Sequence, residues 1–278
     1  MRKLKEYLNR PLSFVMFLLI IISTVITALT VVFIIGYIFI KGVPNLSLDL
    51  FSLKYSSSNQ SMLPSIINTV YLTALTLLLS VPIGIFSAIY LAEYSRKNSF
   101  FVKIINIANE TLSGIPSIVY GLFGFLAFVI SKKWGYSLLA GVITLAIMVL
   151  PLIIRTSQEA MLGVDNTFRE ASYGLGAGKL RTVFKIVLPS AMPGILSGII
   201  LAIGRIVGET AALIYTAGTV PEAATKLTSS SRTISVHLYC LLNEGLYTKQ
   251  AYATAVVLIV FVVIINALSN ALAKKIMK

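Results

Sequence analysis

The sequence reads Glu170-Ala171-Ser172-Tyr173-Gly174-Leu175-Gly176-Ala177-Gly178 between two apolar segments of membrane length, and it runs on through Lys179 to Leu188-Pro189. This polar stretch carries charges of both signs, small residues suited to a turn, and a closing proline. A connection that only joined two membrane helices needs far fewer residues. We therefore expect a partner in the cytoplasm to bind this stretch.

The composition is that of a membrane protein with several helical spans. The 278 residues are 57% hydrophobic and 12% charged, whereas a soluble domain carries about 25% charged residues. The net charge of +13 is better explained by the excess of lysine and arginine on the cytoplasmic side of a membrane protein. We therefore expect no nucleic-acid partner. The single cysteine, Cys240, excludes an internal disulfide and a cysteine-rich metal site.

The apolar runs predict about six transmembrane helices, at residues 12–40, 64–92, 101–131, 136–155, 191–218 and 251–274. The first run is too long for a signal peptide, so we expect it to stay as a membrane helix. With the N-terminus in the cytoplasm, 15 lysines and arginines fall on the inner side and 7 on the outer side. This imbalance favours both termini inside, although Lys132 and Lys133 on the outer side make the third and fourth spans less secure.

Two outer connections are long. Residues 41–63 have the composition of an exposed loop, and residues 219–250 begin polar and become amphipathic from Ile234 to Tyr239. We expect that second part to form a short helix at the outer face. His237, the only histidine in the chain, is interpreted as an outer-surface residue rather than a metal ligand. The acidic residues do not cluster, so nothing supports paired-carboxylate catalysis.

The polar stretch itself predicts a helix, a turn and a second helix. Residues 170–175 can form about one and a half turns, Gly176 to Gly178 permit a sharp turn, and residues 180–188 resume the helix. Pro189 then ends that helix or starts the next span. Tyr173, Leu175 and Phe184 would be apolar anchors for a partner groove. An ordinary amphipathic connector stays an open alternative.

Two ionisable residues lie inside the fifth apolar run, where charge is costly and usually faces a bundle interior or a water-filled route. Arg205 and Glu209 are four residues apart, so on one helix face they can pair. Gly204 and Gly208 have the same spacing and would allow close helix approach. Two interpretations remain open: an ion pair that only fixes packing, or a cationic site on an anion pathway, where an arginine fork suits a tetrahedral oxyanion.

Two further charges sit near the expected cytoplasmic side. Arg155 ends the fourth expected span, where it would either anchor the helix at the membrane surface or face the same route. Glu110 would either face the interior or cap the third span. The residues alone leave both alternatives open.

The polar stretch resembles the loop signature of ABC importer permeases. Glu170, Ala171, Gly176, Ile186, Leu188 and Pro189 stand at the spacing of that family, and Ser172 replaces a second alanine found in many members. The resemblance implies an all-α polytopic membrane protein of the MetI-like fold, with a coupling helix that fits a cleft on an ATPase. The chain has no phosphate-binding Gly-x-x-x-x-Gly-Lys-Ser/Thr loop. We therefore expect no enzyme activity and no cofactor in this chain, with ATP and Mg bound by a partner ATPase.

Three more motifs resemble PstA-type phosphate permeases in particular: Ser113 to Gly124 in the third span, Gly204 to Ala211 in the fifth, and Val236 to Tyr239 before the last. The likeness runs from about Ser65 to the C-terminus. It implies Arg155, Arg205 and Glu209 as charged residues of a phosphate route. It also implies a PstC-like homologous permease, two PstB-like ATP-binding subunits and an extracytoplasmic PstS-like phosphate-binding protein, all at a prokaryotic inner membrane.

The expected organisation is therefore an N-terminal helix and outer loop over residues 1–63, and a permease core over residues 64–278. The core contains the coupling loop, a name used below for residues 156–190. Glu170, Ala171, Tyr173, Gly176, Ile186, Leu188 and Pro189 are its expected ATPase-coupling residues. The alternatives are a permease for another oxyanion, such as sulfate or molybdate, and a channel or membrane sensor that works without ATP.

Overall fold

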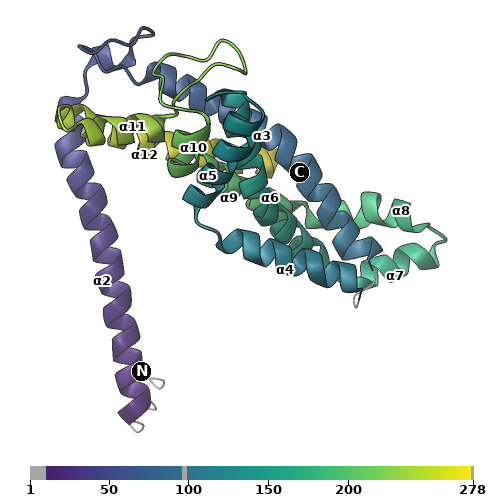
Figure 1. Cartoon of the computed structure of the whole chain (residues 1–278). Coiled ribbons are helices and arrows are strands. Elements are labelled where there is room, and N and C mark those ends of the chain that lie inside the picture. Colours follow the sequence, from purple (N-terminus) through teal and green to yellow (C-terminus); the bar gives the residue numbers. More distant parts are fainter. Residues whose placement is uncertain (1–10, 96–98, 277–278) are drawn as a thin grey trace.

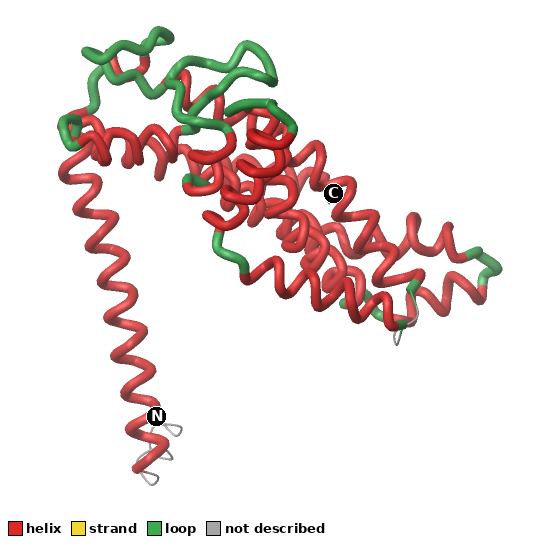
Figure 2. Tube along the Cα trace, viewed as in Figure 1, coloured by secondary structure: helices red, strands yellow, loops and turns green. Residues whose placement is uncertain are grey.

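The computed structural model describes residues 11–95 and 99–276, and these are all helix or connecting loop, without a strand (Figures 1 and 2). The longer helices are α2 (Pro11–Gly42), α3 (Leu63–Ile89), α4 (Phe100–Gly114), α6 (Leu138–Leu162), α9 (Leu188–Gly208), α11 (Ile234–Glu244) and α12 (Thr248–Ile276). The shorter ones are η1 (Val43–Asn45), η2 (Leu48–Phe51), η3 (Tyr90–Tyr94), α5 (Ser117–Gly124), η4 (Phe125–Ser131), α7 (Asn166–Gly174), α8 (Lys179–Thr182), η5 (Val183–Val187) and α10 (Ala211–Thr216).

Helix α6 is the centre of the bundle. Two thirds (67%) of its apolar stretch is buried inside the chain, and Leu145, Val149 and Ile153 are completely inaccessible. It packs against both α3 and α9, which also contact each other. Because lipid tails are as apolar as leucine, close packing rather than hydrophobicity must hold these helices together.

Small residues allow this close packing. A Cβ atom on Gly84 of α3 would lie 2.6 Å from Ile153 Cγ2, and one on Gly194 of α9 would lie 2.6 Å from Ala160 Cβ. A Cβ atom on Gly198 would clash with Thr156. Gly194 and Gly198 are four residues apart, as are Thr156 and Ala160, so α6 and α9 meet through two matched rows of small side chains.

Within the described residues, five helices are long and apolar enough to cross a membrane, and a sixth span follows if the bent pair α4 and α5–η4 counts as one. Two expected boundaries were wrong, those of the fourth and fifth spans. The third span runs from Phe100 to Ser131, close to its expected bounds, but it bends by 101° at Ile115 and Pro116, because proline disfavours a helical conformation at the residue before it. The fourth span continues to Leu162, so Arg155 lies inside it rather than at its end. The fifth stops at Gly208.

Helix α2 stands away from the rest of the chain in Figure 1 and meets α12 at its upper end. None of its apolar stretch is buried within the chain. The backbone of Tyr252 leaves no room for a side chain at Gly42, which fixes the contact with α12. The division of the chain at residue 63 remains a prediction.

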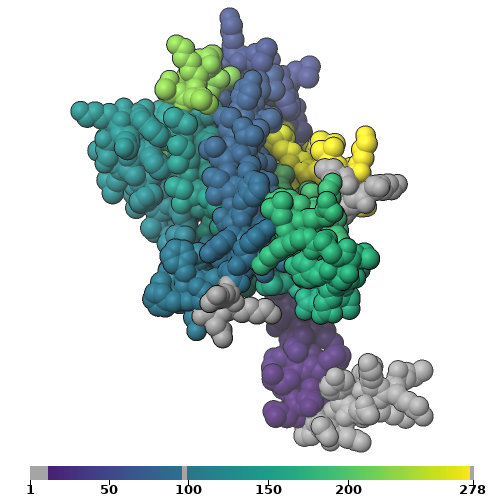
Figure 3. All heavy atoms as spheres, turned by 90° about the vertical axis from the view of Figure 1, so that its right-hand side faces the viewer, coloured from purple at the N-terminus to yellow at the C-terminus, as the bar shows by residue number. Residues whose placement is uncertain are grey.

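The opposite end from the coupling loop is a cap made of η1, η2, α11 and the segment between α10 and α11 (Figure 1). The light green segment between α10 and α11 is at the upper edge of Figure 3. Asn68 of α3 organises it: its Nδ2 donates to the carbonyl oxygens of Glu222 (2.9 Å) and Arg232 (3.1 Å), and its Oδ1 accepts from Ala224 N (2.8 Å). The expected short helix is confirmed as α11, and its place at the outer face stays a prediction. The prediction that His237 lies at the surface was wrong, because its side chain is fully buried.

Seven of the 15 lysines and arginines expected on the inner side lie outside the described residues: Arg2, Lys3, Lys5, Arg10, Arg96, Lys97 and Lys278.

Candidate functional site: a coupling loop and two polar hollows

The coupling loop folds as the sequence predicts, a helix, a turn and a second helix. Asp165 caps α7, its Oδ1 accepting from the backbone N (2.9 Å) and the hydroxyl (3.0 Å) of Thr167. These hydrogen bonds hold the pKa of the Asp165 carboxyl below its usual value. They also satisfy backbone donors at the start of α7 that no helical partner reaches.

Gly176 makes the turn. Its φ of +80° is left-handed, a conformation that favours glycine. Its N–H donates to Tyr173 O (2.9 Å), and the N–H of Ala177 donates to Ser172 O (3.1 Å). This pair of bonds is a Schellman motif, which ends a helix and satisfies its last carbonyls.

Ser172, the one departure from the permease signature, has a role in this loop. Its hydroxyl lies 2.8 Å from that of Thr182, and both residues are buried. The hydrogen bond joins α7 to α8 across the turn. An alanine at this position would leave the Thr182 hydroxyl with only its 3.3 Å bond to Gly178 O.

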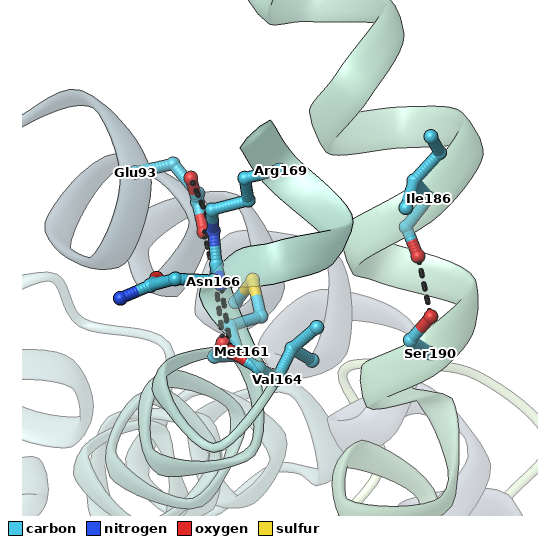
Figure 4. A network of polar contacts seen from close by, with 7 residues as sticks. All are labelled: Glu93, Met161, Val164, Asn166, Arg169, Ile186 and Ser190. Carbon is cyan, nitrogen blue, oxygen red and sulfur yellow. Dashed lines mark hydrogen bonds and ion pairs between the residues drawn. The ribbon is translucent and has the colours of Figure 1, made fainter. Parts of the chain in front are cut away.

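Pro189 lies in the first turn of α9, and the helix runs through it without a break. Its missing N–H and its ring disturb the preceding helical turn, and η5, a π-helical segment, lies directly before α9. The chain then continues as helix from Lys179 to Gly208. Of the other signature residues here, Ile186 and Leu188 are half-buried, and the carbonyl of Ile186 accepts from the Ser190 hydroxyl at 2.7 Å (Figure 4).

The loop presents apolar side chains to its surroundings. Leu175 is 89% exposed and Leu180 69%, while Glu170 and Ala171 are exposed beside them. The expected anchors Tyr173 and Phe184 are also exposed, and so is Phe168, which the sequence did not single out. Large apolar residues gathered on a polar loop are typical of a surface that another protein covers.

Arg205 and Glu209 do not pair, contrary to expectation. Helix α9 ends at Gly208 and Glu209 is extended (ψ 131°), so the spacing of four no longer places both side chains on one helical face. The Glu209 carboxylate instead accepts from the N–H of Ala212 at 3.1 Å and is buried. Gly204 and Gly208 have no atom within 4 Å of an added Cβ, so the close approach expected there is absent within the described chain.

Arg205 lines a hollow of about 550 Å³ between α6, α9 and α12. Ser197 and Asn266 are the other polar residues of its lining. Asn266 Oδ1 is buried without a hydrogen-bond partner. Nothing in the sequence singles out Asn266. One amide in an apolar run is common, and Arg205, which lines the same hollow, is 61 positions away.

Arg155 lines a different hollow, of about 210 Å³, between α4 and α6. Its Nε donates to Glu159 Oε1 at 2.9 Å, and both side chains are more than half exposed. Glu110, whose place the sequence left open, lines this hollow too, together with Asn106, Asn109 and Gln158. The structure therefore places the two predicted arginines on separate hollows that both border α6.

Known proteins resemble this chain over most of its length. Residues 80–278 match the family described as "Binding-protein-dependent transport system inner membrane component". The phosphate transport system permease protein PstA of Pasteurella multocida is 34% identical, covering 95% of this chain and 93% of that protein. The probable ABC transporter permease YqgI of Bacillus subtilis is 32% identical, covering 83% and 84%.

A solved structure shares the fold. A bacterial ABC transporter involved in import of the acidic polysaccharide alginate superimposes with a TM-score of 0.68 at 18% identity, over all of both chains. With these relatives, the chain belongs to the inner membrane components of binding-protein-dependent transport systems, as a PstA-type ABC transporter permease.

Proposed function

We propose that this permease conducts inorganic phosphate into the cell as half of an ATP-driven pore. The observation that carries the proposal is the likeness to a phosphate permease over 95% of the chain. The other half of the pore would be a homologous PstC-like subunit. A PstS-like protein would deliver phosphate from outside, and both chain termini would be cytoplasmic.

The coupling loop would dock on a PstB-like ATPase, one of two in the complex, which binds ATP and Mg. Leu175 and Leu180 are exposed on the loop, and a short helix with apolar anchors is suited to a partner groove. Closure of the ATPases would push α7, and Glu170 is exposed to contact them. This chain would contribute no catalytic group to hydrolysis.

Arg205 would be the main phosphate contact. Its guanidinium can donate two parallel hydrogen bonds to an oxyanion, and the amide of Asn266 and the hydroxyl of Ser197 line the same hollow. The buried Glu209 would limit how tightly the site holds the anion. Arg155, in the second hollow, would act at a different stage of the route.

Uptake of radiolabelled phosphate by the reconstituted complex, with and without ATP, tests the proposal. Excess unlabelled sulfate or molybdate serves as competitor. We expect ATP-dependent uptake that resists both. Inhibition by either competitor would favour a permease for that oxyanion. A native pull-down without an ATPase would favour a channel or sensor instead.

A further inference from the structure

Arg169, one residue before Glu170, makes an ion pair that joins distant parts of the chain (Figure 4). Its Nη2 lies 2.6 Å from Glu93 Oε1, and its Nε donates to the same oxygen at 3.1 Å. The two side chains are only 14% and 6% exposed. Glu93 belongs to η3 at the end of α3, 76 positions earlier.

The same guanidinium binds the end of α6. Its Nη2 donates to Met161 O at 2.8 Å and its Nη1 to Val164 O at 2.7 Å. One side chain of α7 thereby holds both α3 and α6. Only arginine has enough donors, in a planar arrangement, to make all these bonds at once; lysine has a single ammonium group.

A second contact joins η3 to the other side of the loop. Tyr94 directly follows Glu93, and Lys179 Nζ lies 4.9 Å from the centre of its ring, within range of a cation–π interaction. The π-helical turn η3 thus contacts the coupling loop both before and after the turn at Gly176.

The helices that Arg169 holds are themselves packed without spare room, as Gly84 against Ile153 shows. Closely packed interiors transmit displacement rather than absorbing it. A push on the exposed face of α7 would therefore reach α3 and α6 through Arg169. The Arg169 side chain is buried and bonded to Glu93, Met161 and Val164, whereas a residue in a simple surface connector needs none of these contacts.

We propose that Glu93 and Arg169 form a latch that makes α7, α3 and α6 move as one body, so that ATPase closure reaches the membrane helices. Both are positioning residues, since neither lies in the phosphate hollows or on the exposed docking face. The inference rests on the proposed function of the coupling loop and adds the path by which that loop acts.

The test compares complexes that carry Glu93→Gln, Glu93→Asp or the control Glu244→Gln with the wild type. Glu93→Gln keeps an acceptor oxygen but removes the charge, and Arg169 keeps its backbone partners. Glu93→Asp keeps the charge but shortens the reach, which guards against a variant that fails to fold. Glu244 is an exposed carboxylate at the end of α11. For each complex we would measure assembled ATPase, ATP hydrolysis and phosphate uptake.

We expect Glu93→Gln to assemble and hydrolyse ATP, while phosphate imported per ATP falls about 10-fold, the size of a typical coupling between sites. Glu93→Asp should fall less, and Glu244→Gln should match the wild type. A wild-type ratio in both Glu93 variants would overturn the latch. So would a proportionate loss of assembly, hydrolysis and uptake, because that is what a merely structural pair predicts.

A second measurement tests the latch without assuming that phosphate is the substrate. The extracytoplasmic binding protein should stimulate ATP hydrolysis in the wild type, and that stimulation should vanish in Glu93→Gln. If the wild type shows stimulation but no phosphate uptake, the proposed substrate is wrong and the latch is judged by stimulation alone. Stimulation retained in Glu93→Gln would then overturn it.

Discussion

At the scale of single residues, Gly176 is the position in the coupling loop with a left-handed backbone conformation. Its left-handed φ closes α7 and aims the chain back toward the membrane. Gly178, two residues later, has an ordinary φ of −74°. Neither has an atom within 4 Å of an added Cβ, so the two glycines differ in conformation and not in available space.

Gly176→Ala should therefore weaken docking and Gly178→Ala should not. An alanine in the left-handed region costs about 1 kcal/mol, which would lower affinity for the ATPase about fivefold. Titration of the purified permease with the ATPase subunit would measure this. Equal affinities for the two variants would mean that the turn is not what positions the docking face.

His237 gives the cap a dependence on pH. Burial, assisted by the nearby Arg232, lowers its pKa to about 3 from the usual 6.5. As pH falls below 6.5 the unfolded chain gains a proton that the folded chain does not, so stability should decline between pH 6.5 and 3.

His237→Phe removes that proton while keeping an aromatic ring beside Tyr55, which His237 meets edge-on. We expect the melting temperature of the variant minus that of the wild type to increase when the pH is lowered from 7.5 to 5, because the wild type loses stability over this range and the variant does not. A difference that stays constant with pH would show that His237 titrates normally in the folded protein.

At the scale of elements, the packing of α6 against α9 depends on Gly194 and Gly198. Gly198→Leu would place a side chain where Thr156 lies, and overpacking of this kind costs about 1–3 kcal/mol. Thermal unfolding of the purified permease should show the loss. Gly36→Leu is the matched control, because an added Cβ there meets no atom within 4 Å; an equal loss in both would contradict the close-packed interface.

The sequence predicted which elements exist better than where they break. Apolar length alone identified the membrane helices, and the permease signature identified the coupling loop. The break after Gly208 could not be read from composition, because no proline marks it and the Glu209 carboxylate satisfies a backbone donor only three residues further on, Ala212 N. The expected Arg205–Glu209 pair was wrong because it assumed an unbroken helix.

Contacts between residues far apart in the sequence could not be predicted for a different reason. Glu93 and Arg169 each look like ordinary charges near a membrane surface, and nothing local in the sequence connects them. Asn68 is likewise an unremarked amide, yet it binds backbone groups more than 150 positions away. Only the folded chain brings such residues together, α3 meeting α7 at Glu93 and the segment before α11 at Asn68.

At the scale of the whole molecule, exposed apolar surface and polar hollows lie on different elements. Helix α2 is unburied within the chain, the coupling loop carries exposed leucines, and the Arg205 hollow opens between α6, α9 and α12. One body therefore offers a membrane face, the proposed docking face and the proposed anion site. The latch is the connection between the last two.

We propose that phosphate passes Arg205, so the measurement that decides is phosphate uptake by a complex that carries Arg205→Gln. The rate is normalised to assembled complex, and Lys249→Gln, at an exposed position in the first turn of α12, is the control. A hydrogen bond to a charged group contributes about 1.5–3 kcal/mol, so uptake should fall at least about 10-fold while assembly survives. Wild-type uptake by fully assembled Arg205→Gln complexes would contradict the assignment of the phosphate route.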